Sequence, residues 1–262
     1  MDKTNHISIK VLIMAVLMIA LPSSAAFSSG KMPKSYKIKV LEILPFNSDL
    51  YTQGLFFHSR NLYVSGGQYG SSSFHRTELK SAKSLKSFKV PKEYFLEGAA
   101  VVGSNVYILT WQERVCFVHD INSFKQIKTI FNPKEGWGLT YDGTNLIMSD
   151  GSSDLYFLDP ATFKEKSKIS VNINGRKVSQ LNELEYINGE IWANVYMTDQ
   201  IVIINPKTGN VTGIVDCKGL LAAGLRTDKT DVLNGIAYNP ANKGIYVTGK
   251  YWPKIYRIAL VM

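Results

Sequence analysis

The chain has 262 residues, of which 45% are apolar, and it contains 14 Tyr, 12 Phe and 4 Trp. This length and composition exclude a largely disordered chain and supply a sizeable core for one large domain or two small ones. The formal net charge is +9, but the lysines are spread along the chain without an arginine-rich stripe, so nucleic acid binding is not expected. Many short apolar runs end in Gly, Asn, Asp or Pro, which indicates β structure rather than helix.

The first segment, residues 1–26, is predicted to be a secretory signal peptide. Two lysines precede an apolar run of 11 residues, 11–21, and small residues follow up to Ala26. A basic start, a short apolar run and a small-residue exit are typical of such signals, whereas a membrane span needs about 20 apolar residues. A retained N-terminal anchor is the alternative. Cleavage predicts a secreted or periplasmic protein with no membrane span, in which residues 27–262 form the folded domain.

The folded domain repeats a short phrase: a polar or aromatic residue, then usually glycine, then an apolar residue. The copies are Gln53-Gly54-Leu55, Glu97-Gly98-Ala99, Trp137-Gly138-Leu139, Asn182-Glu183-Leu184 and Asn234-Gly235-Ile236. Their central residues are 44, 40, 45 and 52 positions apart. Each phrase opens a unit in which further strands are predicted, the second at 61–67, 105–111, 145–151, 190–196 and 244–250, and the third at 74–79, 114–120, 154–160, 200–206 and 254–260. Several units continue into a weaker fourth strand.

Three or four strands in a unit of about 40 to 50 residues are typical of β-propeller blades. The sequence therefore predicts an all-β protein, a five-bladed β-propeller without an internal domain boundary. The lead-in strand "YKIKVLEIL", at 36–44, has no blade of its own. It is predicted to supply the outer strand of the last blade and so to close the ring. An open sandwich is the competing fold, and the periodic repeats argue against it.

Equivalent positions of successive blades lie at equivalent places around the axis, so the phrases predict a ring of side chains at one mouth of the channel. The first positions are Gln53, Glu97, Trp137, Asn182 and Asn234. The ends of the second strands point to the same mouth and carry Gln68, Tyr69, Trp111, Asp150, Tyr196 and Lys250. An aromatic-walled pocket with two carboxylates, one ammonium and several amides is expected, which is a common form of binding site.

Glu97 lies in the otherwise apolar stretch "YFLEGAAVV" and is the only carboxylate among the first positions. Burying an unpaired charge costs several kcal/mol, so such a residue is paired, protonated or functional. A structural carboxylate that accepts backbone N–H groups or pairs with Lys250 is the alternative to catalysis. Packing between blades is the alternative for Trp111 and Trp137, turn capping for Asn182, and a solvated surface lysine for Lys250.

Several other polar residues are expected to be structural. Glu183 and Glu185 alternate on one face of a strand, and Glu185 is expected to be tied to the backbone. The run "SDGSSD" resembles a calcium-ligand run but lacks the glutamate of an EF-hand, so Asp150 is expected in a turn. No metal ligand is predicted, although a structural calcium or zinc ion in the channel is left open. Cys116 and Cys217 could pair in an oxidising compartment, but Cys116 lies in an apolar strand and fits a buried small hydrophobe better.

With these phrases the sequence resembles the glutaminyl-peptide cyclotransferases of the plant and bacterial type. The matching phrases include "YTQGL", "LEGA", "YILTWQ", "EGWGLTYDG", "SDGSSDLYFLDPATF", "LNELEYINGEIWANVYMTDQI", "VLNGIAYN" and "VTGKYWPKIY". The resemblance implies a five-bladed propeller and an acyltransferase that cyclises N-terminal glutaminyl residues of peptides or proteins to pyroglutamate with loss of ammonia. No cofactor is required in this interpretation, and a monomer is expected.

The resemblance implies that Glu97 is the acid/base group, because one carboxyl can move a proton from the attacking amine to the leaving amine. Lys250 is expected beside it as a second catalytic residue. The expected substrate-binding residues are Gln53, Trp111, Trp137, Asn182 and Tyr196. The family usually has Trp where Tyr196 stands, which bears on substrate fit more than on chemistry. A secreted, non-catalytic propeller that binds peptides or glycans is the alternative function.

Overall fold

The computed structural model describes residues 32–262, and the predicted signal peptide lies outside them. Strands make up nearly all of the regular structure in this part of the chain, together with one 3-10 turn, η1 (Ala223–Leu225). The all-β class predicted from the sequence is confirmed. Between Met32 and the C-terminus, no helix has the length and hydropathy of a membrane span.

Three antiparallel sheets are each built from four consecutive strands. The first contains β2 (Tyr51–His58), β3 (Asn61–Gly67), β4 (Ser73–Thr77) and β5 (Ser84–Lys89). The second contains β6 (Leu96–Val102), β7 (Asn105–Thr110), β8 (Val115–Asp120) and β9 (Gln126–Phe131). The third contains β10 (Leu139–Tyr141), β11 (Leu146–Ser149), β12 (Asp154–Leu158) and β13 (Glu165–Ser170). Strands therefore form at the predicted second and third positions of these units.

A further sheet has eight strands in two antiparallel sets of four. One set is β16 (Leu181–Ile187), β17 (Glu190–Val195), β18 (Gln200–Ile204) and β19 (Val211–Asp216). The other is β20 (Leu233–Asn239), β21 (Gly244–Gly249), β22 (Lys254–Val261) and β1 (Lys34–Pro45). The lead-in strand β1 pairs antiparallel with β22, as the sequence predicts for an outer strand. It also pairs parallel with β19, and this contact, like the small hairpin of β14 (Asn172–Ile173) and β15 (Arg176–Lys177), was not predicted.

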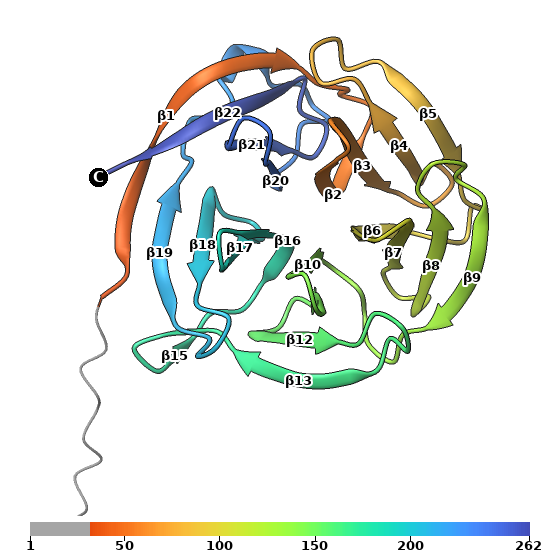
Figure 1. Ribbon diagram of the computed structural model, residues 1–262. Coiled ribbons are helices and arrows are strands. Elements are labelled where there is room, and N and C mark those ends of the chain that lie inside the picture. The colour runs from red at the N-terminus through yellow and green to blue at the C-terminus, as the bar shows by residue number, and fades with distance from the viewer. Residues whose placement is uncertain (1–31) are drawn as a thin grey trace, which may run out of the picture.

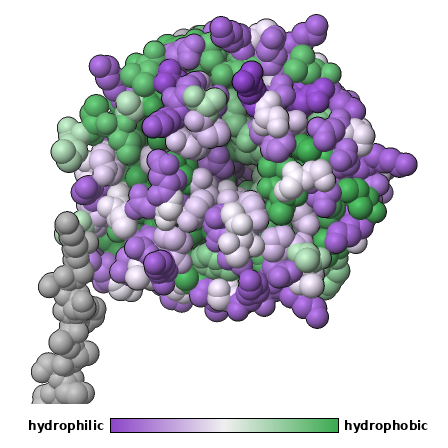
Figure 2. All heavy atoms as spheres, in the orientation of Figure 1, coloured by the Kyte–Doolittle hydropathy of each residue, from purple (hydrophilic) through white to green (hydrophobic). Residues whose placement is uncertain are grey.

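The sheets surround a central axis. Figure 1 shows β2, β6, β10, β16 and β20 innermost, with β5, β9, β13, β19 and β1 on the outside. Each inner strand contacts the next, from β2 through β6, β10 and β16 to β20, and β20 contacts β2. The face shown in Figure 2 mixes hydrophilic and hydrophobic residues around a centre that is hollowed. Side chains from distant parts of the sequence therefore meet at the axis.

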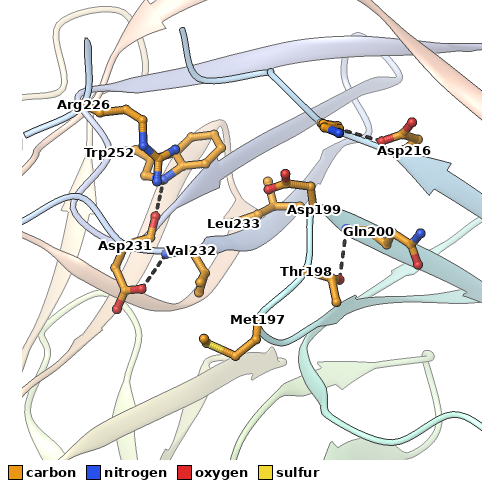
Figure 3. A pocket seen from close by; sticks show the side chains of 11 residues that line it. Met197, Thr198, Asp199, Gln200, Asp216, Arg226, Asp231, Val232, Leu233 and Trp252 are labelled. Carbon is orange, nitrogen blue, oxygen red and sulfur yellow. Dashed lines mark hydrogen bonds between the residues drawn. The ribbon is translucent and has the colours of Figure 1, made fainter. Parts of the chain in front are cut away.

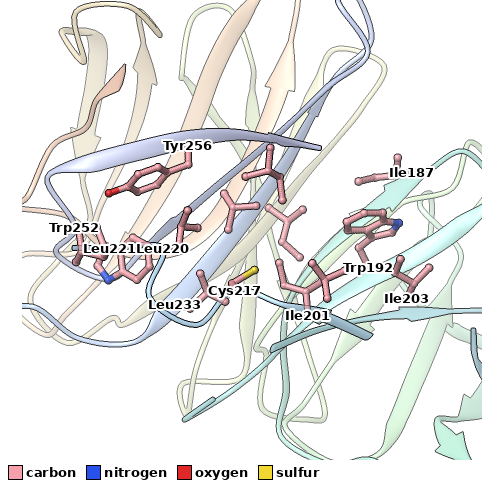
Figure 4. Packing of buried hydrophobic residues seen from close by; sticks show 14 residues of the cluster. Ile187, Trp192, Ile201, Ile203, Cys217, Leu220, Leu221, Leu233, Trp252 and Tyr256 are labelled. Carbon is pink, nitrogen blue, oxygen red and sulfur yellow. The ribbon is translucent and has the colours of Figure 1, made fainter. Parts of the chain in front are cut away.

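The hydrophobic core is divided into clusters between neighbouring sheets. In the cluster of Figure 4, Trp192 and Ile203 lie on one side and Trp252 and Tyr256 on the other. Cys217 is buried in this cluster and Cys116 in another, and both thiols are free. The two cysteines therefore do not pair, and the interpretation of Cys116 as a buried small hydrophobe is confirmed.

The glycine of the repeated phrase is explained by the close approach of the inner strands. A Cβ atom on Gly98 would lie 2.6 Å from the carbonyl oxygen of Trp137, and the Gly98 N–H donates to that oxygen over 2.6 Å. The fourth phrase has Glu183 in place of glycine. Its carboxylate accepts the backbone N–H of Leu55 over 3.1 Å and that of Ile236 over 2.8 Å. Glu183 therefore ties three inner strands together across the axis.

Candidate active site

One pocket of about 190 Å³ opens among the ends of the inner strands. Its lining comprises Tyr51, Gln53, Gln68, Phe95, Glu97, Trp111, Trp137, Asn182, Tyr196 and Lys250. The structure thus brings together all seven side chains that the sequence singles out as catalytic or substrate-binding. Their functions stay predictions, because proximity alone does not test them.

Bulges at the start of the inner strands explain how these side chains reach the pocket. The pairing of β6 with β7 shifts register between Leu96 and Ala99, which leaves Glu97 outside the regular ladder. The same shift occurs beside Gln53 in β2 and beside Asn182 in β16. A bulge turns the side chain of an extra residue away from the regular alternation. The repeated phrase therefore marks the residues at which an inner strand bulges beside the axis.

Glu97 is only 4% exposed, and its Oε1 accepts a hydrogen bond from Nε2 of Gln53 over 3.0 Å. Burial raises the pKa of Glu97 well above its ordinary value. The charge of Lys250 opposes this rise in pKa, and those of Glu113 and Glu135 add to it. Within residues 32–262, the ion pairs closer than 4.0 Å do not include Glu97. The structure therefore differs from the alternative in which backbone N–H groups or an ion pair with Lys250 satisfy this carboxylate.

Lys250 is 2% exposed, so it is not a solvated surface lysine. Its Nζ lies 4.4 Å from the ring centre of Tyr51 and 4.9 Å from that of Tyr196. Burial lowers the pKa of Lys250 to about 8, although the charges of Glu97 and Asp231 oppose the change. Cation–π contacts with two tyrosines thus hold an ammonium that can lose its proton at mildly alkaline pH.

The aromatic wall is held by a carboxylate that does not line the pocket. Glu135 Oε2 accepts the indole N–H of Trp111 over 2.9 Å and that of Trp137 over 3.4 Å. Trp137 meets Tyr196 edge to face at 5.8 Å, and Trp111 meets Phe95 at 5.6 Å. Fixed rings give the pocket a fixed shape, and both tryptophans line the pocket as well as packing against other rings.

Asn182 lines the pocket and is 3% exposed, and among the described residues its buried Oδ1 has no hydrogen-bond partner. Buried polar atoms are nearly always paired, so an unpaired acceptor in the wall of a pocket is unusual. Its backbone carbonyl accepts from Ser149 Oγ over 2.8 Å, which helps to fix the position of the residue. Turn capping does not describe this side chain.

Three residues expected at the mouth lie elsewhere. Asn234 lies behind Gln53, where its Nδ2 donates to Oε1 of Gln53 over 3.2 Å. Asp150 caps its own turn by accepting Ser152 N–H over 3.0 Å, so it is a turn residue as expected, and the pocket has one carboxylate instead of two. Tyr69 is 48% exposed, and its hydroxyl donates to Glu113.

Sequence reasoning missed Tyr51 and Phe95, which also line the pocket. Each lies two positions before the first residue of a phrase, and alternate residues of a strand share a face, so period-2 alternation could have found both.

Glu185 accepts the backbone N–H of Tyr238 over 2.8 Å, which confirms its expected tie to the backbone. Among residues 32–262, no three His, Cys, Asp or Glu side chains come together as a metal site would require.

Comparisons with known proteins agree with the resemblance seen in the sequence. The model of the glutamine cyclotransferase family matches residues 11–260. The glutaminyl-peptide cyclotransferase of Arabidopsis thaliana is 39% identical over 257 residues, which cover 94% of this chain and 80% of that protein. The crystal structure of Myxococcus xanthus glutaminyl cyclase matches with a TM-score of 0.81 at 31% identity, over 87% of this chain and 98% of that chain.

Proposed function

The chain belongs to the glutamine cyclotransferase family, and we propose that it cyclises N-terminal glutaminyl residues of peptides to pyroglutamate with release of ammonia. The observation that carries the proposal is the environment of Glu97. This carboxyl is buried, is held by one amide donor and faces a pocket with an aromatic wall. A propeller that only binds peptides or glycans has no need for a carboxyl with a raised pKa at this position, which favours the enzyme over that alternative.

The reaction joins the substrate α-nitrogen to its γ-carbonyl carbon and then breaks the bond from that carbon to the amide nitrogen. The attacking nitrogen must lose one proton, and the departing nitrogen must gain one to leave as ammonia. We propose that the carboxylate of Glu97 accepts the first proton and returns it to the leaving nitrogen. A raised pKa suits a group that must both take and give a proton near neutral pH. No cofactor enters this scheme.

Three pocket residues are proposed to act on the groups around the reacting atoms. Lys250 donates to a substrate carbonyl oxygen, where an ammonium stabilises developing negative charge. The amide of Asn182, which lines the pocket, binds the polar groups of the substrate. Gln53 keeps its Nε2 on Glu97 and so holds the proton carrier in place.

The aromatic residues are proposed to fold the substrate onto itself. Both reacting groups belong to one residue, so the pocket lowers the barrier by holding the flexible side chain in the curled geometry in which the amine meets the carbonyl carbon. Trp111, Trp137 and Tyr196 surround the space in which the glutaminyl side chain must curl back. Tyr196 places a hydroxyl where the family usually has an indole, so we propose that it tunes substrate fit.

We also propose a five-bladed arrangement for the fold. The eight-stranded sheet divides into two blades that share the parallel contact of β1 with β19, and β1 is the outer strand of the last blade. The contact of β20 with β2 supports closure of the ring.

We further propose that residues 1–26 are a cleaved signal peptide and that the protein acts as a monomer in the periplasm or outside the cell.

The test is ammonia release from a Gln-Ala dipeptide amide, with detection of the pyroglutamyl product by mass. Wild type should turn the peptide over, and Glu97→Gln should lose at least about a hundredfold in kcat. An Asn-Ala dipeptide amide serves as the substrate control, because its shorter side chain cannot close a five-membered ring. Binding of the Gln peptide without ammonia release would favour the non-catalytic alternative, and full turnover by Glu97→Gln would overturn the proposed mechanism.

A further inference from the structure

A second cavity of about 460 Å³ lies beside the active-site pocket and is larger than that pocket. Figure 3 shows Asp231 and Val232 on one side of it and the turn from Met197 to Gln200 on the other. Leu233 and Trp252 also line it, although both are nearly fully buried, and Arg226 adds a guanidinium. We call this space the downstream cavity. It lies between the second half of the β16–β19 set and the beginning of the β20–β22 set.

The two cavities share a thin wall. Tyr196 lines the pocket, and the next residue, Met197, lines the downstream cavity. Lys250 lines the pocket, and its backbone pairs with the segment on the other side: Asp231 N–H donates to Lys250 O over 3.0 Å, and Lys250 N–H donates to Val232 O over 2.9 Å. The charge of Asp231 also acts on Tyr51 and Lys250, both in the pocket. A peptide that leaves the pocket over the exposed Met197 would therefore enter the downstream cavity directly.

The proposed chemistry fixes the direction in which the substrate leaves the pocket. The attacking and the departing nitrogen must both reach the Glu97 carboxyl, so they lie on that side of the pocket. The α-carbonyl that continues the peptide is the remaining substituent, and it points away from Glu97. Tyr51, Tyr196 and Lys250 contact one another and form the wall that separates the pocket from the downstream cavity, and we take this wall as the one that the α-carbonyl faces.

We propose that the downstream cavity binds the residues that follow the N-terminal glutamine, so that the enzyme prefers peptides of at least four residues to dipeptides. The proposal rests on the proposed function. An extended residue spans about 3.3 Å, so three residues reach roughly 10 Å beyond the glutamine. Leu233 and Trp252 are nearly fully buried, and the exposed Met197 supplies apolar surface beside the polar lining, which suits a peptide chain with mixed side chains.

The cavity lining carries three carboxylates, those of Asp199, Asp216 and Asp231, and two cations, those of Lys218 and Arg226. One of these cations is free to bind an acidic side chain of the peptide. Within the described part of the chain, the Arg226 guanidinium makes neither an ion pair nor a hydrogen bond, whereas Asp216 is paired with Lys37. Lys218 adds a second cation at the rim, and Lys250 lies behind the wall. A guanidinium binds a carboxylate through two parallel hydrogen bonds. We therefore infer that Arg226 selects peptides with Glu at the third or fourth position.

The experiment compares kcat/KM for Gln-Ala amide, Gln-Ala-Ala-Ala amide and Gln-Ala-Glu-Ala amide, so that no free terminal carboxylate interferes. In wild type we expect the Glu tetrapeptide to exceed the dipeptide about tenfold. Arg226→Ala should reduce the advantage of the Glu over the Ala tetrapeptide about fivefold, the upper range for an exposed ion pair. Gln200→Trp places a ring at the rim and should bring both tetrapeptides close to the dipeptide. Lys229→Ala, in the same loop but outside the cavity lining, is the matched control and should change neither ratio.

The outcomes separate this inference from the proposed function. If wild type turns over none of the three peptides, the proposed function fails. If wild type turns over the dipeptide but the three peptides have equal kcat/KM, the downstream cavity is not a binding site. A kcat/KM that rises with peptide length but is the same in wild type, Arg226→Ala and Gln200→Trp would also overturn the inference, because the added affinity would then arise elsewhere on the surface.

Discussion

Gln53 donates a hydrogen bond from Nε2 to Oε1 of Glu97 over 3.0 Å, although the two residues are 44 positions apart in the chain. The Gln53 amide is itself oriented, because its Oε1 accepts from Nδ2 of Asn234 over 3.2 Å. The amide nitrogen therefore faces Glu97 and the amide oxygen faces away. A donor stabilises the ionised form of a carboxyl, so this bond opposes the rise in pKa that burial imposes on Glu97.

Replacement of Gln53 by Met should slow the reaction and shift its pH dependence. The loss of the donor raises the pKa of Glu97 further, so the acidic fall of kcat/KM should move to higher pH. A hydrogen bond to a charged group contributes about 1.5–3 kcal/mol, which predicts a tenfold to hundredfold drop in kcat. The measurement is the pH profile of ammonia release from Gln-Ala amide. Gln126→Met, on the exposed outer strand β9, is the control, and an unchanged profile in Gln53→Met would contradict the prediction.

Lys250 should set the alkaline side of the same profile. Burial lowers the pKa of Lys250 to about 8, so the ammonium is lost as the pH rises through that value. The substrate α-amine titrates at about 8 as well, but its loss of a proton favours attack and so raises the rate. We expect kcat/KM to fall above about pH 8 in wild type. In Lys250→Arg the charge persists to above about pH 12, so the fall should disappear from the range up to pH ~10 while kcat is lower throughout.

The outcome that would count against this assignment is an alkaline fall at the same pH in Lys250→Arg. Lys243→Arg, at an exposed position outside the pocket, controls for the added guanidinium and should keep the profile of wild type.

Glu135 should act on substrate binding through the two tryptophans that it holds. Glu135→Ala leaves both indole N–H groups without an acceptor, and we expect KM to rise about tenfold from the loss of two hydrogen bonds. Glu135→Gln keeps one acceptor oxygen and should raise KM less. Both variants remove a charge that raises the pKa of Glu97, so the fall of kcat/KM on the acidic side should move to lower pH.

A purely structural function for Glu135 would change KM or stability but would leave the pH profile where it is. Glu78→Ala, at an exposed site in the loop between β4 and β5, is the control for the loss of a carboxylate. The three profiles, recorded with one peptide, separate the effect of the charge on Glu97 from the effect of the tryptophan orientation.

Repetition made the candidate site predictable. Glu97 and Lys250 come from different sheets, yet both were placed at one mouth because equivalent positions of repeated units lie together around an axis. Alternation along a strand also explains Tyr51 and Phe95 once the bulges are known. What repetition cannot predict is the partner that each side chain chooses. Asn182 and Asn234 occupy the same position of the phrase, but Asn182 faces the pocket and Asn234 donates to Gln53.

Other features depend on contacts between units that differ from blade to blade. The carboxylate that holds Trp111 and Trp137 belongs to Glu135, at the position two before the phrase where the preceding units have the aromatic residues Tyr51 and Phe95. The parallel contact of β1 with β19 depends on the path of a single strand over the outside of two sets. No periodic pattern encodes such contacts, because they occur once in the chain.

Replacement of two buried glutamates, Glu183 and Glu97, by uncharged residues should have different effects on the stability of the protein. Glu183 accepts two backbone N–H groups, from Leu55 and Ile236, with separate oxygens. Glu183→Leu leaves both donors buried without a partner, at about 1–3 kcal/mol each. For a domain of this size, roughly 2–4 °C are lost per kcal/mol, so the unfolding temperature should fall by ~4–24 °C.

Glu97→Gln, in contrast, removes activity without lowering the unfolding temperature. The amide oxygen of the new side chain can still accept from Gln53, and a neutral group carries no penalty for burial. Since the folded-state pKa of Glu97 is raised, wild type loses stability from this residue as the pH rises above the ordinary value of 4.5, and the variant does not. The stability of the variant relative to wild type should therefore increase between pH 5 and pH 8, as measured by urea unfolding at each pH. A constant difference over that range would mean that Glu97 titrates at its ordinary pKa and cannot be the buried proton carrier proposed here.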